Sequence, residues 1–353
     1  MKKGKTTNET VGWLTGTGRD GDIVLSSRIR LARNIDGFSF LSKISPARQK
    51  ELSLLLRDTI LAAELADDME FIQLNEIPDV DRQLLVERHL ISKELARAEG
   101  ERGVAVGRRE TLSIMVNEED HLRLQVLHAG FELDEIWRAI SEVDDALASR
   151  LPYAFSKELG YLTACPTNVG TGLRVSVMLH LPGMVMTRHL EKVFNAVGKL
   201  NLVVRGLYGE GTQAVGDLYQ VSNQRTLGKT EEDIIGNLAA VVPQVIDYER
   251  QVREAILREG RSLIEDQAWR AYGILSAARS IASEEALYLL SRVRLGVNMG
   301  LIHKLDVAAI NRLHMLTQPA HVQRRHGRKL SSEDRNRLRA DLIRAALAEV
   351  AAG

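Results

Sequence analysis

The chain has 353 residues, of which 44% are hydrophobic and 27% charged, and its 47 basic and 47 acidic side chains balance to a formal net charge of zero. This composition is typical of a globular protein with room for two domains, and zero net charge excludes a general attraction to nucleic acid or to an anionic membrane. The single cysteine excludes a disulfide scaffold and fits a reducing compartment, and no apolar run reaches the roughly 18 residues of a membrane span. We therefore expect a cytoplasmic protein with no membrane segment and no direct nucleic-acid binding.

The first chemical feature follows a polar segment, residues 1–19, which we interpret as an N-terminal tail. Residues 24–34 read VLSSRIRLARN, and Arg28 and Arg30 point to the same side of an extended chain because strand side chains alternate. Arg33 follows closely, and three guanidinium groups this near to one another repel unless an anion or carboxylates compensate them. The interleaved apolar residues indicate a strand packed on a core. We therefore favour phosphate binding over a solvated run of charge.

Helices are predicted after this strand, and the second of them carries a histidine. Ser45 and Pro46 form the N-cap and first turn of one helix, and a second helix is expected over residues 81–97. His89 lies in the second helix, and by itself it is more simply a packing or surface histidine than a ligand.

An acidic turn between two predicted strands is the next informative stretch. Residues 111–126 carry Glu118, Glu119 and Asp120 in a row, followed by Arg123. A carboxylate held at such a rim can act as a general base if a proton donor lies within reach. The alternative is a solvated acidic loop.

The central loop carries the only cysteine. Residues 165–172 read CPTNVGTG, and the proline and two glycines rule out a regular element there. The residues that follow alternate with period two, which predicts a strand with Arg174 on its polar face. Free backbone N–H groups and a nearby guanidinium favour an anion beside Cys165, whereas a buried structural cysteine is the alternative.

A second glycine-rich loop and a helical region complete the chain. Residues 201–212 are predicted to form a strand that ends in a loop with Arg205 and Glu210, either a substrate-ordered lid or a flexible surface loop. A long helix follows, kinked or reset at Pro243, and polar residues around 258–261 indicate a domain boundary. Other helices are expected near residues 188–199, 264–280, 284–296, 306–316 and 333–350.

Together these segments resemble a known family. The motifs SSRIR, NEEDHLR, CPTNVGTGLR, RGLYGEGT and DLYQVSN resemble the catalytic domain of the phosphagen (guanidino) kinases, the family of creatine and arginine kinases. The resemblance implies an α+β fold, in which an antiparallel sheet flanked by helices forms a catalytic domain over residues 20–254. A small all-α domain over residues 258–353 follows it. No GxxxxGK[ST] segment is present, so the nucleotide is not expected to bind through a P-loop.

The order of the domains indicates one branch of that family. Phosphagen kinases that act on free guanidines carry a helical domain before the first arginine motif, whereas here that motif begins at residue 24 and extra residues follow the catalytic domain. This arrangement resembles the bacterial protein arginine kinases. It implies an enzyme that uses ATP with Mg²⁺ to phosphorylate arginine side chains of proteins.

The resemblance also implies roles for single residues. Glu119 and Glu210 match the paired catalytic carboxylates, and Cys165 matches the thiolate beside the guanidinium. Five arginines match those that clamp the nucleotide phosphates, and a histidine matches one that contacts the nucleotide. The ATP-binding residues implied in this way are Ser26, Ser27, Arg28, Ile29, Arg30, His89, Arg123, Arg174, Val175, Ser176, Val177, Met178, Arg205, Gly206, Leu207, Tyr208 and Gly209. No metal site built from protein side chains is expected.

A further motif lies in the helical region. Residues 335–340 read RNRLRA and resemble the RDxxRA motif that binds phosphoarginine and regulates the kinase in this family. The implied site comprises Arg335, Asn336, Arg339 and Ala340. Asn336 replaces the acid of the motif, and an amide oxygen accepts only a neutral hydrogen bond where a carboxylate would pair with a guanidinium.

The same resemblance implies a cellular role and partners. The expected role is to mark proteins for Clp-type degradation and to regulate a heat-shock repressor. The expected partners are an activator protein, a Clp ATPase or protease, and a second copy of the chain in a homodimer. Two alternatives stay open, a non-catalytic phosphoarginine-binding adaptor and a free-guanidine phosphagen kinase. The intact carboxylates, cysteine and arginines oppose the first, and the missing helical domain opposes the second.

Overall fold

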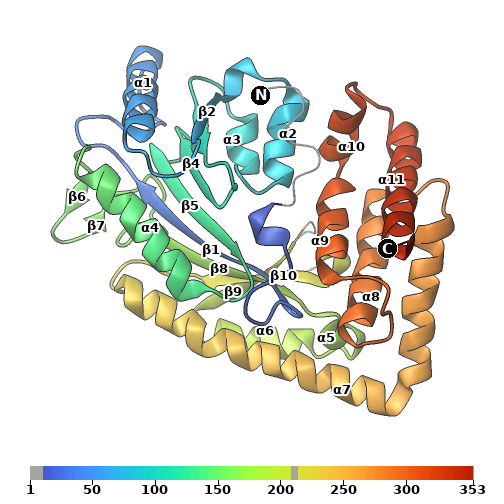
Figure 1. Ribbon diagram of the computed structural model, residues 1–353. Coiled ribbons are helices and arrows are strands. Elements are labelled where there is room, and N and C mark those ends of the chain that lie inside the picture. Colours follow the sequence, from blue (N-terminus) through green and yellow to red (C-terminus); the bar gives the residue numbers. More distant parts are fainter. Residues whose placement is uncertain (1–10, 208–213, 353) are drawn as a thin grey trace.

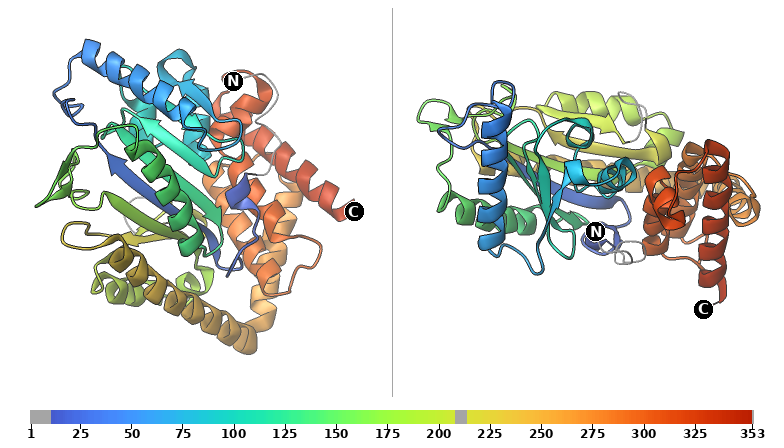
Figure 2. Two further views of the ribbon diagram at one scale, coloured as in Figure 1. Left: turned by 60° about the vertical axis from the view of Figure 1, so that its left-hand side comes forward. Right: turned by 90° about the horizontal axis from the view of Figure 1, so that it is seen from above.

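The computed structural model describes residues 11–207 and 214–352, which form a sheet domain with a helical domain at its side (Figures 1 and 2). The main sheet is antiparallel, with strand order β2-β3-β4-β5-β1-β8-β10-β9. Its strands are β1 (Val24–Arg33), β2 (Glu70–Gln73), β3 (Gly103–Val106), β4 (Leu112–Val116), β5 (Leu122–Ala129), β8 (Leu173–His180), β9 (Leu202–Gly206) and β10 (Leu218–Asn223). A separate hairpin pairs β6 (Phe155–Ser156) with β7 (Gly160–Tyr161). The expected α+β class is confirmed.

The two faces of the sheet differ in polarity because side chains alternate along each strand. On β1, Ile29 and Leu31 enter the main apolar core, so Arg28 and Arg30 lie on the opposite face. The helices that supply the other half of this core are α1 (Pro46–Ala62), α4 (Leu133–Ala148), α6 (Leu190–Gly198) and the first part of α7 (Glu231–Ala277). The opposite, polar face carries the two arginines of β1.

The helix expected over residues 81–97 is two helices. α2 (Asp79–Glu87) and α3 (Lys93–Arg97) are separated by a turn in which His89 has a positive φ of 59°. The prediction of one continuous helix was wrong because this left-handed residue reverses the chain. The turn aims His89 away from the helix axis and toward the polar face of the sheet.

The long helix α7 joins the two domains. It passes through Pro243 with helical backbone angles, and its single non-helical residue is Gly260, with φ −149° and ψ 37°. The predicted kink at Pro243 was therefore misplaced, whereas the break at Gly260 falls inside the predicted boundary at residues 258–261. Figure 1 shows α7 running along the sheet domain and then turning up into the helical domain.

The helical domain has its own apolar core, built from the second part of α7 and from later helices. These are α8 (Ser283–Asn298), α9 (Val307–Leu316) and α11 (Ser332–Ala352). α10 (Pro319–His326) lies outside this core and packs against α2 of the sheet domain. Four of the five expected helical segments after residue 230 correspond to this domain, but α10 was not predicted. Short connecting elements elsewhere are η1 (Gly12–Leu14), η2 (Leu74–Glu76), η3 (Val215–Asp217) and α5 (Pro182–Met186).

Buried polar contacts join the helical domain to the sheet domain. The carboxylate of Glu87, at the end of α2, accepts hydrogen bonds from the backbone N–H of Ala320 at 2.8 Å and of His321 at 3.0 Å. It thereby caps the first turn of α10 with a negative charge, where the helix dipole favours one. At a second point Ser291 of α8 donates to Asp217 at 2.6 Å and lies 2.9 Å from the Nε2 of His180.

The segment before β1 is packed rather than free. Residues 1–10 lie outside the described part of the chain, but Trp13 and Leu14 are only 3% and 2% exposed. They belong to a small apolar cluster with Leu127 of β5 and Met315 of α9. The interpretation of residues 1–19 as a tail is thus wrong for residues 11–19. Among the described residues no helix is both long and apolar enough to cross a membrane.

Candidate active site

Five arginines line the polar face of the sheet. The strand register sets Arg30 of β1 opposite Arg174 of β8, and Arg123 of β5 opposite Ala32. On β10, Gln220 pairs with Met178 of β8 on one side and with Arg205 of β9 on the other. Because side chains at paired positions lie on the same face, the five predicted arginines, Arg28, Arg30, Arg123, Arg174 and Arg205, share one face.

These cations are crowded and incompletely paired. Burial, and then the charges of Arg174 and Arg123, lower the pKa of Arg28 to about 10. Burial and neighbouring arginines also lower the pKa values of Arg30 and Arg174. Among the described residues, Nε of Arg30 and Nε of Arg174 are buried without a hydrogen-bond partner. Like charges held together with unused donors are a site for a polyanion, which would compensate the charge and accept those hydrogen bonds.

The three consecutive acids of the predicted turn have three different environments. Glu118 is only 2% exposed and pairs with Arg123 at 2.7 Å. Glu119 is 48% exposed, and its carboxylate lies 3.3 Å from the same guanidinium. Burial raises the pKa of Glu119 above its ordinary value, and the charge of Arg123 opposes that rise. Glu119 is therefore the acid whose carboxylate remains accessible to a substrate, as a general base requires.

The third acid, Asp120, connects the acidic turn to the cysteine loop. It is fully buried, and its Oδ1 accepts hydrogen bonds from Nδ2 of Asn34 and from the backbone N–H of Ala164, both at 2.7 Å. Ala164 precedes Cys165, so one carboxylate oxygen fixes the cysteine next to Glu119. The sequence analysis grouped the acids and did not predict this role, because the contact joins residues 44 positions apart.

The cysteine loop is held by close backbone contacts. Gly170 has φ 107°, and a Cβ there would lie 2.9 Å from backbone atoms of residues 226 and 227. Thr226 donates to the carbonyls of Thr167 and Val169 at 2.9 and 2.7 Å. The Sγ of Cys165 lies 3.0 Å from Oγ1 of Thr167 and is partly accessible. The thiol therefore stands at the rim and is not a buried core group.

Arg33 is separated from the other arginines. It forms a buried ion pair with Asp144 at 2.6 Å, and its guanidinium stacks 3.5 Å from the ring centre of Tyr161. Its odd spacing from Arg28 and Arg30 places it on the core face of the sheet. Arg33 is thus removed from the repulsion expected among the three guanidiniums, which remains between Arg28 and Arg30.

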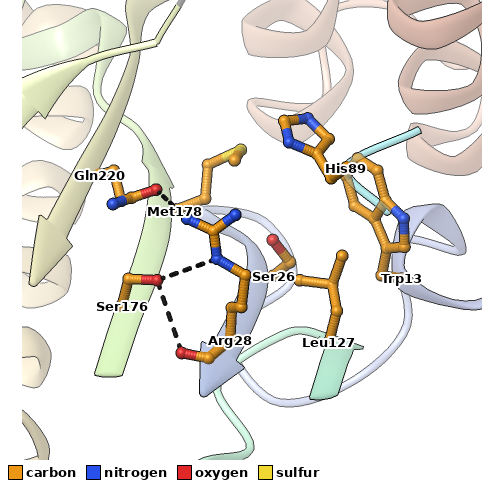
Figure 3. Close-up of a pocket in the computed structure, with 8 residues that line it drawn as sticks. All are labelled: Trp13, Ser26, Arg28, His89, Leu127, Ser176, Met178 and Gln220. Carbon is orange, nitrogen blue, oxygen red and sulfur yellow. Dashed lines mark hydrogen bonds between the residues drawn. The ribbon is translucent and has the colours of Figure 1, made fainter. Parts of the chain in front are cut away.

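We call Arg28, Arg30, Arg123, Arg174 and Arg205 the arginine row. A pocket adjoins Arg28 at one end of this row. Figure 3 shows its lining, which comprises Trp13, Ser26, Arg28, His89, Leu127, Ser176, Met178 and Gln220. Arg28 donates to Oε1 of Gln220 at 2.7 Å and to Oγ of Ser176 at 3.3 Å. Burial, followed by the charges of Arg28 and Lys93, lowers the pKa of His89 to about 3, so its ring is neutral at physiological pH. The structure thus brings His89 to the site.

Other predicted nucleotide-binding residues occupy different positions. Ile29, Val175 and Val177 point into the core, and Ser27 donates to the carbonyl of Gly130 at 2.8 Å. Only the backbone of these residues can approach a ligand. Ser26, Ser176 and Met178 line the pocket, and Gly206 and Leu207 follow Arg205 at the end of β9. Tyr208, Gly209 and Glu210 lie outside the described residues.

The residues of the RNRLRA segment lie on α11. Arg339 is buried and donates to the carbonyls of Thr317 at 2.7 Å and Ile281 at 2.9 Å, and to Oδ1 of Asn336 at 2.8 Å. Arg335 is partly exposed and donates to the carbonyl of Leu330 at 2.8 Å. Ala340 is buried in the domain core. The two arginines thus differ, and Arg335 is the more accessible one.

A metal ion has no dedicated protein ligands in the described part of the chain. Residues 11–207 and 214–352 contain no cluster of three histidine, cysteine or acidic side chains placed to hold one. A row of arginines suits phosphate oxygens, and Mg²⁺ in such sites is held largely by the phosphates themselves.

Comparison with known proteins agrees with this geometry. The family model "ATP:guanido phosphotransferase, C-terminal catalytic domain" matches residues 55–252, and "Protein-arginine kinase McsB C-terminal domain" matches residues 261–353. Among solved structures, lombricine kinase aligns with a TM-score of 0.60 and 27% identity over 68% of this chain and 70% of that chain. The duplicated taurocyamine kinase from Schistosoma mansoni aligns with a TM-score of 0.59 and 27% identity, over 70% of this chain and 35% of that one. Fold and site therefore define a phosphotransferase of the phosphagen kinase class.

Relatives that match almost the whole chain show which family within this class it belongs to. A protein-arginine kinase from Symbiobacterium thermophilum is 51% identical over 95% of this chain and 96% of its own length. One from Halothermothrix orenii is 47% identical over 95% of this chain and 96% of its own. The chain belongs to the protein-arginine kinase family and is an ATP-using phosphotransferase.

Proposed function

We propose that this enzyme binds MgATP along the arginine row and transfers its γ-phosphoryl group to arginine side chains of proteins. The observation that carries this proposal is the convergence at Arg123. That guanidinium ends the arginine row and also lies 3.3 Å from the accessible carboxylate of Glu119. A phosphate-binding cation and a candidate base are thereby adjacent, as transfer from a nucleotide to a nearby nitrogen requires.

The charges of the row supply the electrostatic part of catalysis. In phosphoryl transfer negative charge spreads over the transferred group, and fixed guanidiniums stabilise that charge without reorganising. Arg28, Arg30 and Arg174 are partly buried, so solvent screens their charges less than it screens charges at the surface. Mg²⁺, brought with the nucleotide, would add further positive charge to the phosphates.

The acceptor must lose a proton during the reaction. A guanidinium has a pKa above about 12 and is not a nucleophile while fully protonated. Glu119 accepts that proton in the proposed mechanism, and its raised pKa makes it a stronger base than an ordinary glutamate. The charge of Arg123 opposes this rise. Activity should therefore fall as the pH drops through the pKa of Glu119.

The cysteine loop completes the acceptor site in this proposal. Asp120 fixes Ala164, and with it Cys165, beside the acidic turn. A thiolate there orients the acceptor guanidinium, and Glu210 is proposed as the second carboxylate that binds it. Glu210 lies outside the described residues, so its role rests on the family motif alone.

A regulatory site for phosphoarginine on α11 is part of the same proposal. Arg335 is partly exposed and supplies the cation, while Asn336 accepts a hydrogen bond from Arg339. Arg339 holds the site by binding the carbonyls of Thr317 and Ile281. In the cell, we infer that the modification marks proteins for Clp-type degradation and regulates a heat-shock repressor in the cytoplasm. The proposed partners are an activator protein, a Clp ATPase or protease and a second copy of the chain.

The test is a comparison of two acceptors. With MgATP, kcat/KM is measured for free arginine and for an unfolded protein rich in accessible arginine, and mass spectrometry locates acid-labile phosphate. We expect phosphate on arginine of the protein, little on free arginine and none on lysine, because a planar guanidinium fits paired carboxylates and an ammonium does not. Equal or better use of free arginine would contradict the choice of substrate. Absence of transfer to both would favour a binding adaptor.

A further inference from the structure

Three exposed apolar side chains lie on segments that contact the cysteine loop. Phe155 and Leu159, in the hairpin of β6 and β7, are 59% and 46% exposed, and Leu227, between β10 and α7, is 53% exposed. Single apolar residues on a surface need no explanation, but a group of them beside a reactive site indicates a surface that a partner covers. We call Phe155, Leu159 and Leu227 the apolar patch.

Backbone contacts join the segments that carry the patch to the cysteine loop. The N–H of Tyr161 in β7 donates to the carbonyl of Gly170 at 2.8 Å, and the N–H of Gly170 donates to the carbonyl of Tyr161 at 3.3 Å. Gly160 is as close, because a Cβ there would lie 2.6 Å from the carbonyl oxygen of Gly170. Gly170 also approaches Leu227, since a Cβ on Gly170 would lie 2.9 Å from the Cα of Leu227. The cysteine loop therefore touches both parts of the patch.

The hairpin is also fixed relative to the acidic turn. Nδ2 of Asn34 donates to the carbonyl of Leu162, directly after β7, at 3.0 Å, and to the carboxylate of Asp120 at 2.7 Å. The rings of Phe155 and Tyr161 meet edge to face with their centres 5.3 Å apart. Figures 1 and 2 show the hairpin projecting from the end of the sheet domain that is remote from the helical domain. Phe155 is thus held on one side by Tyr161 and left accessible elsewhere.

The patch lies within a short length of chain from the cysteine. Tyr161 precedes Cys165 by four residues, so their Cα atoms are at most about 14 Å apart. An extended polypeptide covers the same distance with about four residues. A substrate whose arginine side chain reaches Cys165 and Glu119 therefore has neighbouring residues within reach of the patch.

We propose that the apolar patch binds the protein substrate, by packing against an apolar side chain within about four residues of the acceptor arginine. This inference rests on the proposed function and deepens it, because it states which arginines the enzyme prefers. The occupant is an unfolded polypeptide, since folded proteins bury most large apolar side chains and unfolded ones expose them beside arginine. Continuity with the acceptor site favours this occupant over a second copy of the chain.

The experiment compares two peptides of equal length that each contain one arginine. One peptide has leucine three residues before and three residues after the arginine, and the other has serine at both positions. With MgATP and the full-length enzyme, kcat/KM should be about tenfold or more higher for the leucine peptide, because burial of one leucine side chain is worth at least that factor. The double variant Phe155→Ser, Leu159→Ser should lose most of this preference through a higher KM for the leucine peptide.

Two further variants separate docking from a general effect on the enzyme. Phe155→Leu keeps an apolar side chain and should retain most of the preference for the leucine peptide. Leu263→Ser is the matched control, because Leu263 is 59% exposed on α7 in the helical domain and should leave the preference unchanged. All the substituted side chains are exposed, so the thermal midpoints should stay close to that of the unmodified enzyme.

The outcomes separate this inference from the proposed function. Equal use of the two peptides, or a preference that the double variant retains, would overturn the substrate-binding role of the patch alone. So would a double variant that changes the sedimentation of the enzyme but not its choice of peptide, since the patch would then contact a second copy of the chain. Phosphorylation of neither peptide would contradict the proposed function, and this inference with it.

Discussion

The polar face of the sheet and the interface between the two domains both hold arginines with buried nitrogens, but Arg294 at the interface differs from the arginines of the sheet face. At the interface, fully buried Arg294 donates to the carbonyls of Gly21 at 2.9 Å and Asp22 at 3.1 Å, and to Asn311 at 3.1 Å. On the sheet face, buried nitrogens of Arg30 and Arg174 find no partner among the described residues.

The pKa values alone do not distinguish the two regions. Burial lowers the pKa of Arg294 to about 9 and that of Arg28 to about 10. The partners make the difference, because backbone carbonyls satisfy Arg294 while the arginines of the row face one another. A buried arginine that ends on carbonyls stabilises the fold, and a buried arginine with unused donors indicates a ligand.

The largest effect on activity is expected from Glu119→Gln, on the polar face of the sheet. The amide keeps the size of the side chain but cannot accept the proton, so we expect phosphorylation of protein arginine to fall about a hundredfold or more. MgATP affinity should stay nearly normal, because Glu119 is not part of the arginine row. Rates are measured under saturating substrate, with Glu76→Gln as a surface control, since Glu76 is exposed in η2. Near-normal turnover would remove Glu119 from the mechanism.

Two methionine variants test directly whether the arginines of the two regions have different roles. Arg294→Met removes the donor to the carbonyl of Gly21 and to Oδ1 of Asn311, whereas the carbonyl of Asp22 keeps its hydrogen bond from Asn298. The variant should lower the free energy of unfolding by about 2 kcal/mol. Arg30→Met removes one of several crowded cations and should leave the thermal midpoint unchanged or higher, while MgATP affinity falls. Calorimetric scans and nucleotide binding measure both. Loss of stability in Arg30→Met with intact nucleotide binding would reverse the roles assigned to the two regions.

A smaller effect on turnover is expected when the cysteine is replaced or alkylated. Cys165 is the only cysteine in the chain, so alkylation is specific to it. If its thiolate orients the guanidinium, Cys165→Ala should slow turnover by about tenfold, which is less than the roughly hundredfold contributed by a group that transfers the proton itself. The thermal midpoint should not change. MgATP with a protein substrate should protect the thiol from alkylation, and an alkylated enzyme of full activity would show that the thiol has no part in the reaction.

Acid should weaken the domain interface, where two buried histidines lie. Burial, then the charge of Arg294, lowers the pKa of His314 to about 3, and burial lowers the pKa of His180 well below its ordinary value. Both rings are neutral when folded. Their contribution to stability is therefore complete above the unfolded pKa of about 6.5 and is lost as pH falls below it, by at most about 1.4 kcal/mol per pH unit and residue.

Unfolding as a function of pH measures this effect. His314→Phe should reduce the loss of stability between pH 6.5 and pH 4, because one proton-binding group is removed. His303→Gln is the control, since His303 is exposed. A pH slope that does not change in His314→Phe would mean that this histidine does not titrate on unfolding.

The smallest effect is expected at the α11 site. Arg335→Ala should weaken activation by phosphoarginine and leave basal turnover unchanged, because the site lies in the helical domain. Asn336→Asp should strengthen activation if a carboxylate there pairs with a guanidinium. Arg337→Ala is the matched control, because Arg337 is exposed on the same helix. Identical phosphoarginine titrations for all variants would mean that the motif has no regulatory role in this chain.

Much of this molecule could be predicted from the sequence because its signals are local. Alternation along residues 24–33 and 173–180 set the arginines on one face, and the strands confirm it. Helical periodicity and polar residues placed the helical domain and the break near Gly260. The family motifs identified Glu119 and Cys165 as members of one site, and the structure brings their segments together through Asp120.

What only the tertiary structure decided are contacts between segments far apart in the chain. Sequence alone did not assign a role to Asp120, because that role depends on contacts with Asn34 and Ala164 rather than on its neighbours in the chain. Nor did it place Trp13, whose burial depends on β5 and α9 arriving from opposite sides. Periodicity reports which side of an element a residue lies on. Which partner the residue contacts on that side depends on how the whole chain packs. The role of each buried charge was therefore decided only by the fold.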